Sequence, residues 1–109
     1  MPAYLVFICR GVTDRKGLEA YWAGVKRTLE GLDVKPHIAY TRFEILEGGG
    51  PVEGVVMMEF PSYEIARKWY DSPQYCEVRK HRTDAADYLG LLVEGGYLPV
   101  EKRMPQFKV

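Results

Sequence analysis

Apolar residues in short runs and at alternating positions predict four β-strands along the chain. The predicted strands cover residues 3–10, 37–47, 55–60 and 88–94. The first strand is apolar at every position from 4 to 9, so both of its faces should be covered by other parts of the protein. Pro61 ends the third strand, because proline cannot donate to a sheet ladder. A glycine-rich turn at residues 48–51 predicts that the second and third strands form an antiparallel hairpin.

Two other segments show the three- and four-residue spacing of amphipathic helices. The apolar positions of the first helix, which follows the potential cap Thr13-Asp14, are Leu18, Trp22, Val25, Leu29 and Leu32. Gly31 or Asp33 ends this helix. The second helix runs from Ser62 to about Ala85 in two parts, because Ser72 can cap a new helix and Pro73 suits its first position.

The element order is strand, helix, strand, strand, helix, strand. This βαββαβ order predicts an α+β domain of the ferredoxin-like plan, an antiparallel sheet with helices on one face. The other face of the sheet would then be bare and apolar, which is unusual for a soluble monomer. We therefore expect a homodimer in which two copies pack through the helix-free sheet face.

Scattered residues resemble the DUF1330 family over roughly residues 1–95. They are Met1-Pro2-Ala3-Tyr4, Leu46-Glu47-Gly48, Glu59-Phe60-Pro61-Ser62, Ala66, Trp69-Tyr70, Ser72-Pro73, Tyr75, Arg82 and Val93-Glu94-Gly95. The resemblance implies a dimeric α+β barrel, in which two ferredoxin-like domains pair. We expect residues 1–96 to form this domain. Residues 97–109 would be a C-terminal extension, either an arm laid over the other subunit or a frayed tail.

One segment departs from the pattern of this family. Family members typically carry an arginine and paired glycines shortly before Leu46-Glu47-Gly48, where this chain has Ala39-Tyr40-Thr41. Arg42 is shifted from the usual arginine position. The added side chains predict a narrower or altered pocket.

Composition and charge exclude several classes of partner. The 109 residues suffice for one domain, and 15 basic residues balance 15 acidic ones. This balance gives no reason to expect nucleic acid or a membrane surface as a partner, and no run approaches the length of a membrane span. Cys9 and Cys76 are expected to be free thiols, which predicts a cytoplasmic location.

The sequence predicts neither a metal site nor a bound cofactor. His37 and His81 stand alone, and neither cysteine has a CxxC partner. The glycines at 48–50 are not followed by the lysine that a phosphate loop needs. His37 begins a predicted strand, where it is either a solvated residue or part of a ligand site.

Glu59 is a carboxylate in an otherwise apolar strand, on the side of Val55 and Met57. A carboxylate in such a place must be paired, hydrated or protonated. It could be a general base, or a partner of a substrate carbonyl, in a cavity between sheet and helices. Alternatively, it forms a structural ion pair with Arg42, Arg79 or Arg82.

Arg82 lies on the second helix and could bind a substrate carboxylate in the same cavity, or form an ion pair at the surface or dimer rim. We expect any small-molecule pocket near the Ser72-Pro73 break, with Glu59 and Arg82 as catalytic candidates. The ligand-binding candidates are Arg42, Tyr70, Ser72, Tyr75 and His37.

Two functions remain open from the sequence. The first is a cofactor-independent enzyme acting on a hydrophobic carbonyl or polyketide-like substrate as an isomerase, cyclase or monooxygenase. The second is a non-catalytic, ligand-binding or stress-linked homodimer. An enzyme needs an acid or base with a perturbed pKa inside a closed cavity, so the pocket distinguishes the two.

Overall fold

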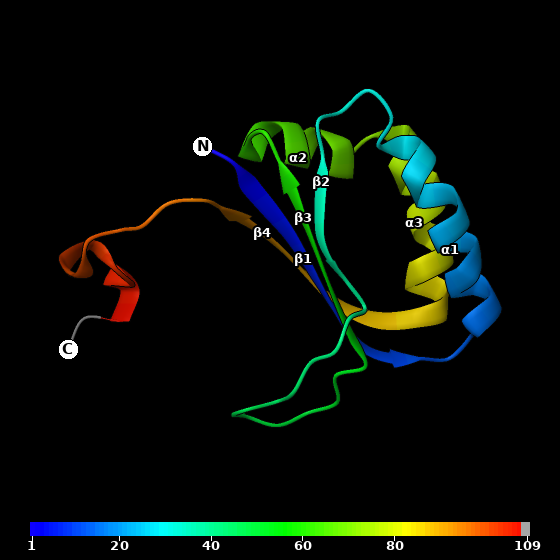
Figure 1. Ribbon diagram of the computed structural model, residues 1–109, viewed down its shortest axis with the longest axis horizontal. Helices are drawn as coiled ribbons and strands as arrows, with labels where there is room; N and C mark the ends of the chain where they lie inside the picture. The colour runs from blue at the N-terminus through cyan, green and yellow to red at the C-terminus, as the bar shows by residue number, and fades with distance from the viewer. Residues whose placement is uncertain (108–109) are drawn as a thin grey trace.

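The computed structural model describes residues 1–107 and confirms the α+β architecture (Figure 1). Its elements are β1 (Ala3–Val12), α1 (Arg15–Thr28), β2 (Lys35–Ala39), β3 (Gly54–Phe60), α2 (Tyr63–Tyr70), α3 (Pro73–Ala85) and β4 (Ala86–Glu94). Two short 3-10 helices follow, at Val100–Lys102 and Pro105–Phe107. The last two residues of the predicted C-terminal extension, 108 and 109, lie outside the described residues. Within residues 1–107, each helix is too short or too polar to cross a membrane.

The four strands form one antiparallel sheet in the order β2-β3-β1-β4. The three α-helices lie on the same side of this sheet (Figure 1). The ferredoxin-like plan predicted from the element order is therefore confirmed.

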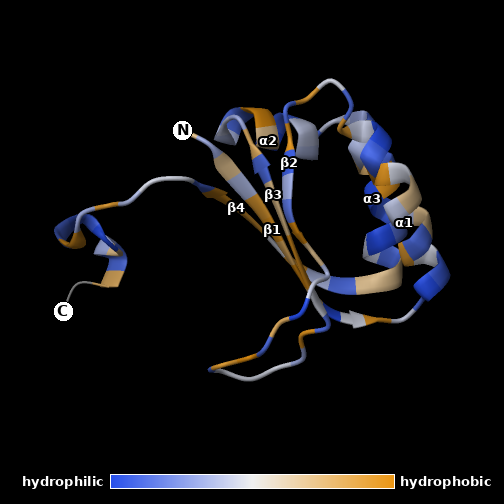
Figure 2. Cartoon of the chain, viewed as in Figure 1, coloured by the Kyte–Doolittle hydropathy of each residue, from blue (hydrophilic) through white to orange (hydrophobic). Residues whose placement is uncertain are grey.

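The two faces of β1 have different surroundings. Leu5 and Phe7 point towards the helices and are buried in the core. Val6 points to the opposite face, where Met57 of β3 and Leu91 of β4 lie beside it. Hydrophobic residues follow one another along much of β1 and β4 in Figure 2, so side chains of this kind point to both faces of the sheet. The helix-free face is thus apolar as well, and Leu91 is 44% exposed in the single chain.

The predicted break in the second helix is confirmed. The Ser62 hydroxyl accepts a hydrogen bond from the Ile65 amide at 3.1 Å and caps α2. The Ser72 hydroxyl accepts one from the Tyr75 amide at 3.2 Å and caps α3, with Pro73 in the first turn. These two bonds satisfy amides that have no partner inside the helices.

The prediction of a strand over residues 37–47 is wrong beyond Ala39. Tyr40 has a φ of 58°, a left-handed conformation that an extended strand cannot contain. Its amide still donates to the Val55 carbonyl at 2.9 Å, which closes the ladder between β2 and β3. The connection through residues 41–53 then forms a loop that projects from the body of the protein (Figure 1).

Candidate functional site

Arg82 of α3 is a cation in the interior of the protein. Only 6% of its surface is exposed. Its guanidinium carbon lies 4.8 Å from the centre of the Phe7 ring, 5.0 Å from that of Tyr88 and 5.3 Å from that of Tyr21. Aromatic rings from β1, β4 and α1 therefore surround the charge, in the geometry of cation–π contacts.

The polar partners of Arg82 are two phenols. Its Nη2 atom donates to the Tyr75 hydroxyl at 3.5 Å, and this hydroxyl lies 2.8 Å from that of Tyr21. The buried Nε atom has no hydrogen-bond partner. The ion pairs within residues 1–107 join Arg15 to Glu19 and Arg67 to Asp71, and a hydrogen bond joins His37 to Glu59, so none of these contacts includes Arg82.

The Tyr21 phenol stays neutral over the physiological pH range. Burial, followed by the effect of Tyr75, raises the pKa of Tyr21 far above its ordinary value of 10.0. Burial alone would lower the pKa of Arg82, but the Tyr75 and Tyr21 phenols outweigh that effect and keep this pKa above its usual value. The site consequently holds a permanent positive charge next to the neutral hydroxyl of Tyr21.

A cavity of about 160 Å³ lies against this cation, between the sheet and α1. We call it the Arg82 cavity. Its walls are mostly apolar or aromatic, and the polar groups are few. The lining residues are Phe7, Tyr21, Trp22, Val25, Ala39, Tyr40, Val56, Met58, Arg82 and Tyr88.

Tyr40 is a partly exposed residue in the wall of the Arg82 cavity. It is 40% exposed, and its hydroxyl accepts a hydrogen bond from Trp22 Nε1 at 3.0 Å. The same hydroxyl lies 2.7 Å from that of Tyr88, whose pKa is raised by burial and by this bond to Tyr40. Gly54 leaves room for the Tyr40 ring, since a Cβ there would come within 2.6 Å of the ring. The predicted narrowing by the Ala39-Tyr40-Thr41 segment therefore has a structural counterpart in Tyr40.

The prediction that Glu59 lines the same pocket as Arg82 is wrong. Met58 is buried in the core on the helix side of β3, so Glu59 points to the helix-free face. There its carboxylate lies 2.7 Å from His37 Nε2 of β2. Glu59 is paired, as one hypothesis required, but its partner is His37 and none of the three expected arginines. His37 was expected to be solvated or part of a ligand site, and the structure places it at the sheet surface as the partner of Glu59.

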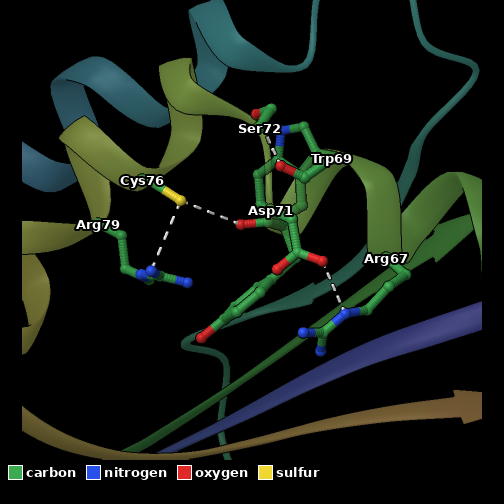
Figure 3. A network of polar contacts seen from close by, with 7 residues as sticks. Arg67, Trp69, Asp71, Ser72, Cys76 and Arg79 are labelled. Carbon is green, nitrogen blue, oxygen red and sulfur yellow. Dashed lines mark hydrogen bonds and ion pairs between the residues drawn. The ribbon is translucent and has the colours of Figure 1, made fainter.

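The residues around the break between α2 and α3 make hydrogen bonds with one another. The Ser72 hydroxyl caps α3 and donates to the Trp69 carbonyl at 2.7 Å (Figure 3). Next to it, Arg79 Nη2 lies 3.5 Å from the Cys76 sulfur (Figure 3), and the Arg79 guanidinium carbon is 4.6 Å from the Tyr70 ring centre. None of these residues lines the Arg82 cavity.

The ligand-binding candidates do not come together in one place. Tyr70 lines a separate hollow of about 150 Å³ with Leu5 and Arg67. Arg42 lies in the exposed loop. Tyr75 contacts Arg82 through its hydroxyl, and it is the one candidate that joins the Arg82 site.

Sequence reasoning missed most of the residues that line the Arg82 cavity. Tyr21 and Trp22 lie beside Leu18 and Val25 on the inner side of α1, so their spacing could have indicated buried aromatic groups there. A similar stripe of Tyr75, Val78, Arg82 and Ala85 on α3 could have indicated that Arg82 faces the core. Tyr40 was indicated by the departure of the Ala39-Tyr40-Thr41 segment from the family pattern, and Tyr88 carried no comparable local signal.

Solved structures support the same fold. A protein of unknown function from Rhodopseudomonas palustris matches with a TM-score of 0.71 and 20% identity, over 89% of this chain and 84% of that one. A DABB family protein with a ferredoxin-like fold from Mesorhizobium loti matches with a TM-score of 0.56 and 13% identity, over 92% and 99%. A dimeric ferredoxin-like protein of unknown function from Thermobifida fusca matches with a TM-score of 0.56 and 10% identity, over 86% and 91%. At these identities the likeness extends to the fold alone.

The sequence comparisons identify the family. No curated protein matches the chain. The family described as a domain of unknown function, DUF1330, matches residues 2–96. This match covers most of the chain and agrees with the resemblance carried by the Glu59-Phe60-Pro61-Ser62 segment and its neighbours, so the chain belongs to the DUF1330 family.

Proposed function

We propose that this protein is a homodimer of the α+β barrel type that binds a small hydrophobic carbonyl compound, polyketide-like in class, in the Arg82 cavity. One observation carries the proposal: a mostly apolar cavity of about 160 Å³ surrounds one buried guanidinium. Small-molecule sites have this composition, an apolar wall with a few polar groups that orient the ligand. Arg82 and Tyr21 would donate hydrogen bonds to the carbonyl oxygen.

The chemistry of the lining favours binding over proton abstraction. The lining contains no carboxylate and no histidine, and the raised pKa values of Tyr21 and Tyr88 make these phenols unsuitable as bases near neutral pH. Glu59, the expected base, is on the other face of the sheet. A non-catalytic ligand-binding role is therefore the first candidate.

A cofactor-independent isomerase, cyclase or monooxygenase is the second candidate. It is favoured by the position of Arg82 beside Tyr21, because a cation and a hydroxyl can stabilise negative charge that develops on a carbonyl oxygen. A ligand that binds and is recovered unchanged would separate the first candidate from this one.

The helix-free sheet face is the proposed dimer interface. Val6, Met57 and Leu91 lie side by side on it, and Val93 is 49% exposed in the single chain. The dimeric protein from Thermobifida fusca shares the fold, which supports a paired arrangement here. A second copy would cover this apolar surface.

The extension from residue 97 fits an arm laid over the partner subunit. It lies beyond the family match and runs away from the body of the protein (Figure 1). Tyr97 is 89% exposed, Val100 73% and Phe107 67%, so its apolar side chains have no cover within the single chain. We place this dimer in the cytoplasm, since Cys9 and Cys76 are both free thiols.

Fluorescence of Trp22 can test ligand binding directly, because its indole lines the cavity. In a Trp69→Phe background Trp22 is the remaining tryptophan. A one-ring aromatic ketone, acetophenone, should change its emission in a saturable manner. Val56→Phe, which fills the cavity from β3, should abolish this change, while Val52→Phe in the outer loop should not. Absence of saturable binding, or equal binding to the Val56→Phe protein, would contradict the proposal.

A further inference from the structure

We infer that the ligand of the Arg82 cavity is a compact organic monoanion, a one-ring aromatic carboxylate or an enoic acid of similar size. Its carboxylate would be the counterion that the buried guanidinium lacks. The inference rests on the proposed function, because it assigns a charge and a size to the ligand of the same cavity.

The first argument is the uncompensated charge. Arg82 is 94% buried, since 6% of its surface is exposed, and it forms no ion pair within residues 1–107. The polar partners of Arg82 are hydroxyl groups and not carboxylates, and burial keeps the pKa of Tyr21 far above its ordinary value, so this phenol does not balance the positive charge. A buried charge without a partner is strongly destabilising, so charges in protein interiors are normally paired. A carboxylate in the adjoining cavity would supply the missing pair.

The second argument is the set of free hydrogen-bond donors. Arg82 Nε has no partner, and the bond from Nη2 to Tyr75 is long at 3.5 Å. The Tyr21 and Tyr75 hydroxyls, 2.8 Å apart, carry two protons, and the bond between them uses one. One hydroxyl proton is therefore left for an acceptor, while the Nε proton is buried and has no partner within residues 1–107. A carboxylate has two oxygens that accept such bonds, and bonds between charged partners are the stronger kind.

The third argument is size. The cavity measures about 160 Å³, and an apolar cavity of about 150 Å³ in another protein holds one benzene molecule. Tyr40 is part of the wall that sets this limit, and hydrogen bonds to Trp22 and Tyr88 hold its ring in place. The space thus suits one ring with its carboxylate directed at Arg82 better than a fused or extended ring system.

Calorimetric titration of the full-length protein with benzoate, benzamide and 2-naphthoate tests the inference. Benzamide has nearly the shape of benzoate without its charge, and 2-naphthoate has the charge with a second ring. We expect benzoate to bind about 10-fold or more tightly than benzamide, and 2-naphthoate to bind more weakly than benzoate. Arg82→Met should remove the preference for benzoate over benzamide. Arg79→Met is the matched control. Like Arg82, Arg79 lies over an aromatic ring, that of Tyr70 in α2, but it does not line the cavity.

The outcomes separate this inference from the proposed function. Benzamide or acetophenone binding as tightly as benzoate would overturn the inference of an anion and leave the proposed function standing. Benzoate binding unchanged in Arg82→Met would overturn it too. No saturable binding of any probe to the wild-type protein would overturn both. The ratio of benzoate to benzamide affinity in the wild-type protein decides the question even if Arg82→Met does not fold.

Discussion

Replacing Arg82 with methionine should make the ligand-free protein more stable. Methionine is unbranched and fills a similar channel through the core, but it carries no charge. The substitution removes a cation that is 94% buried and has no carboxylate partner within residues 1–107. An arginine kept for the architecture of the domain would show the opposite result.

The expected gain follows from opposing effects. Burial of an unpaired ion is destabilising by several kcal/mol even after the protein relaxes. The ring contacts of Arg82 with Phe7, Tyr21 and Tyr88 oppose this effect, because a cation–π contact of a desolvated cation is worth about 2 kcal/mol. The 3.5 Å bond to Tyr75 adds less than the ~1 kcal/mol of an ordinary hydrogen bond. Replacement of buried ion pairs by well-packed apolar residues is often neutral or stabilising by ~1–4 kcal/mol. Loss of the ring contacts puts our expectation for this single ion at the lower end of that range, about 1 kcal/mol.

Urea unfolding at one fixed protein concentration measures this gain, because the apparent stability of a dimer depends on concentration. Arg79→Met is the control and should lower the free energy of unfolding by no more than about 1 kcal/mol, the value of its contact with the Tyr70 ring. A loss of more than about 1 kcal/mol in Arg82→Met alone would refute the reasoning and make Arg82 a structural residue. Added benzoate should stabilise the wild-type protein and leave Arg82→Met unchanged.

Further predictions concern the core, the sheet face and alkaline pH. Trp69→Ala should lower the free energy of unfolding by ~3–5 kcal/mol, because the indole is 3% exposed and its Nε1 donates to Thr28 at 3.0 Å; a loss below about 1 kcal/mol in urea would contradict this packing role. The proposed homodimer interface should bury more than ~1,200 Å², and Val6→Lys should convert the dimer into monomers in sedimentation at micromolar concentration. A wild-type monomer, or a Val6→Lys protein that remains dimeric, would contradict the proposal that the helix-free face is the interface. The raised folded-state pKa of Tyr21 means that its contribution to stability is complete below pH 10.0, the ordinary pKa, and is lost as the pH rises above it. The wild-type free energy of unfolding should therefore fall by about 1.4 kcal/mol per pH unit from this residue alone, and Tyr21→Phe should unfold with a correspondingly smaller slope; equal slopes would show that Tyr21 titrates normally.

Local chemistry made the order of the elements predictable. Ser62 and Ser72 are helix caps in the structure because each has a side-chain oxygen within reach of an amide three residues on. Pro73 marked the restart of the helix for an equally local reason. Interactions between close neighbours in the chain decide such features, so one sequence suffices to recognise them.

The face occupied by Glu59 could not be decided locally. Alternation correctly placed it on the side of Val55 and Met57, but the opposite side of β3, with Val56 and Met58, is apolar too. A shift of one residue exchanges the two faces of a strand, and only the positions of the helices decide which face is inside. For this reason the sequence could not show that Glu59, the expected base, lies on the opposite face of the sheet from Arg82.

The conformation of Tyr40 depends on distant parts of the chain. Its ring needs the open space at Gly54, and its hydroxyl meets Trp22 of α1 and Tyr88 of β4. An alternating pattern through residues 37–47 predicts that the strand continues, and nothing near Tyr40 opposes that prediction. Contacts across the fold override the local preference here.

Two unfavourable features meet at the same cavity, and their coincidence supports a binding role. Tyr40 holds a left-handed backbone conformation that destabilises a residue other than glycine by about 1–3 kcal/mol. Arg82 holds a buried charge without a counterion. Proteins retain such local violations mainly where function requires them. The substitution Arg82→Leu would remove the buried charge, but it would also remove the only charged group in the cavity lining. The substitution Tyr40→Gly would relieve the backbone conformation, but it would open the solvent side of the cavity. A ligand that pairs with Arg82 and packs under Tyr40 would offset both unfavourable features on binding, which neither an empty structural cavity nor a surface ion pair could do.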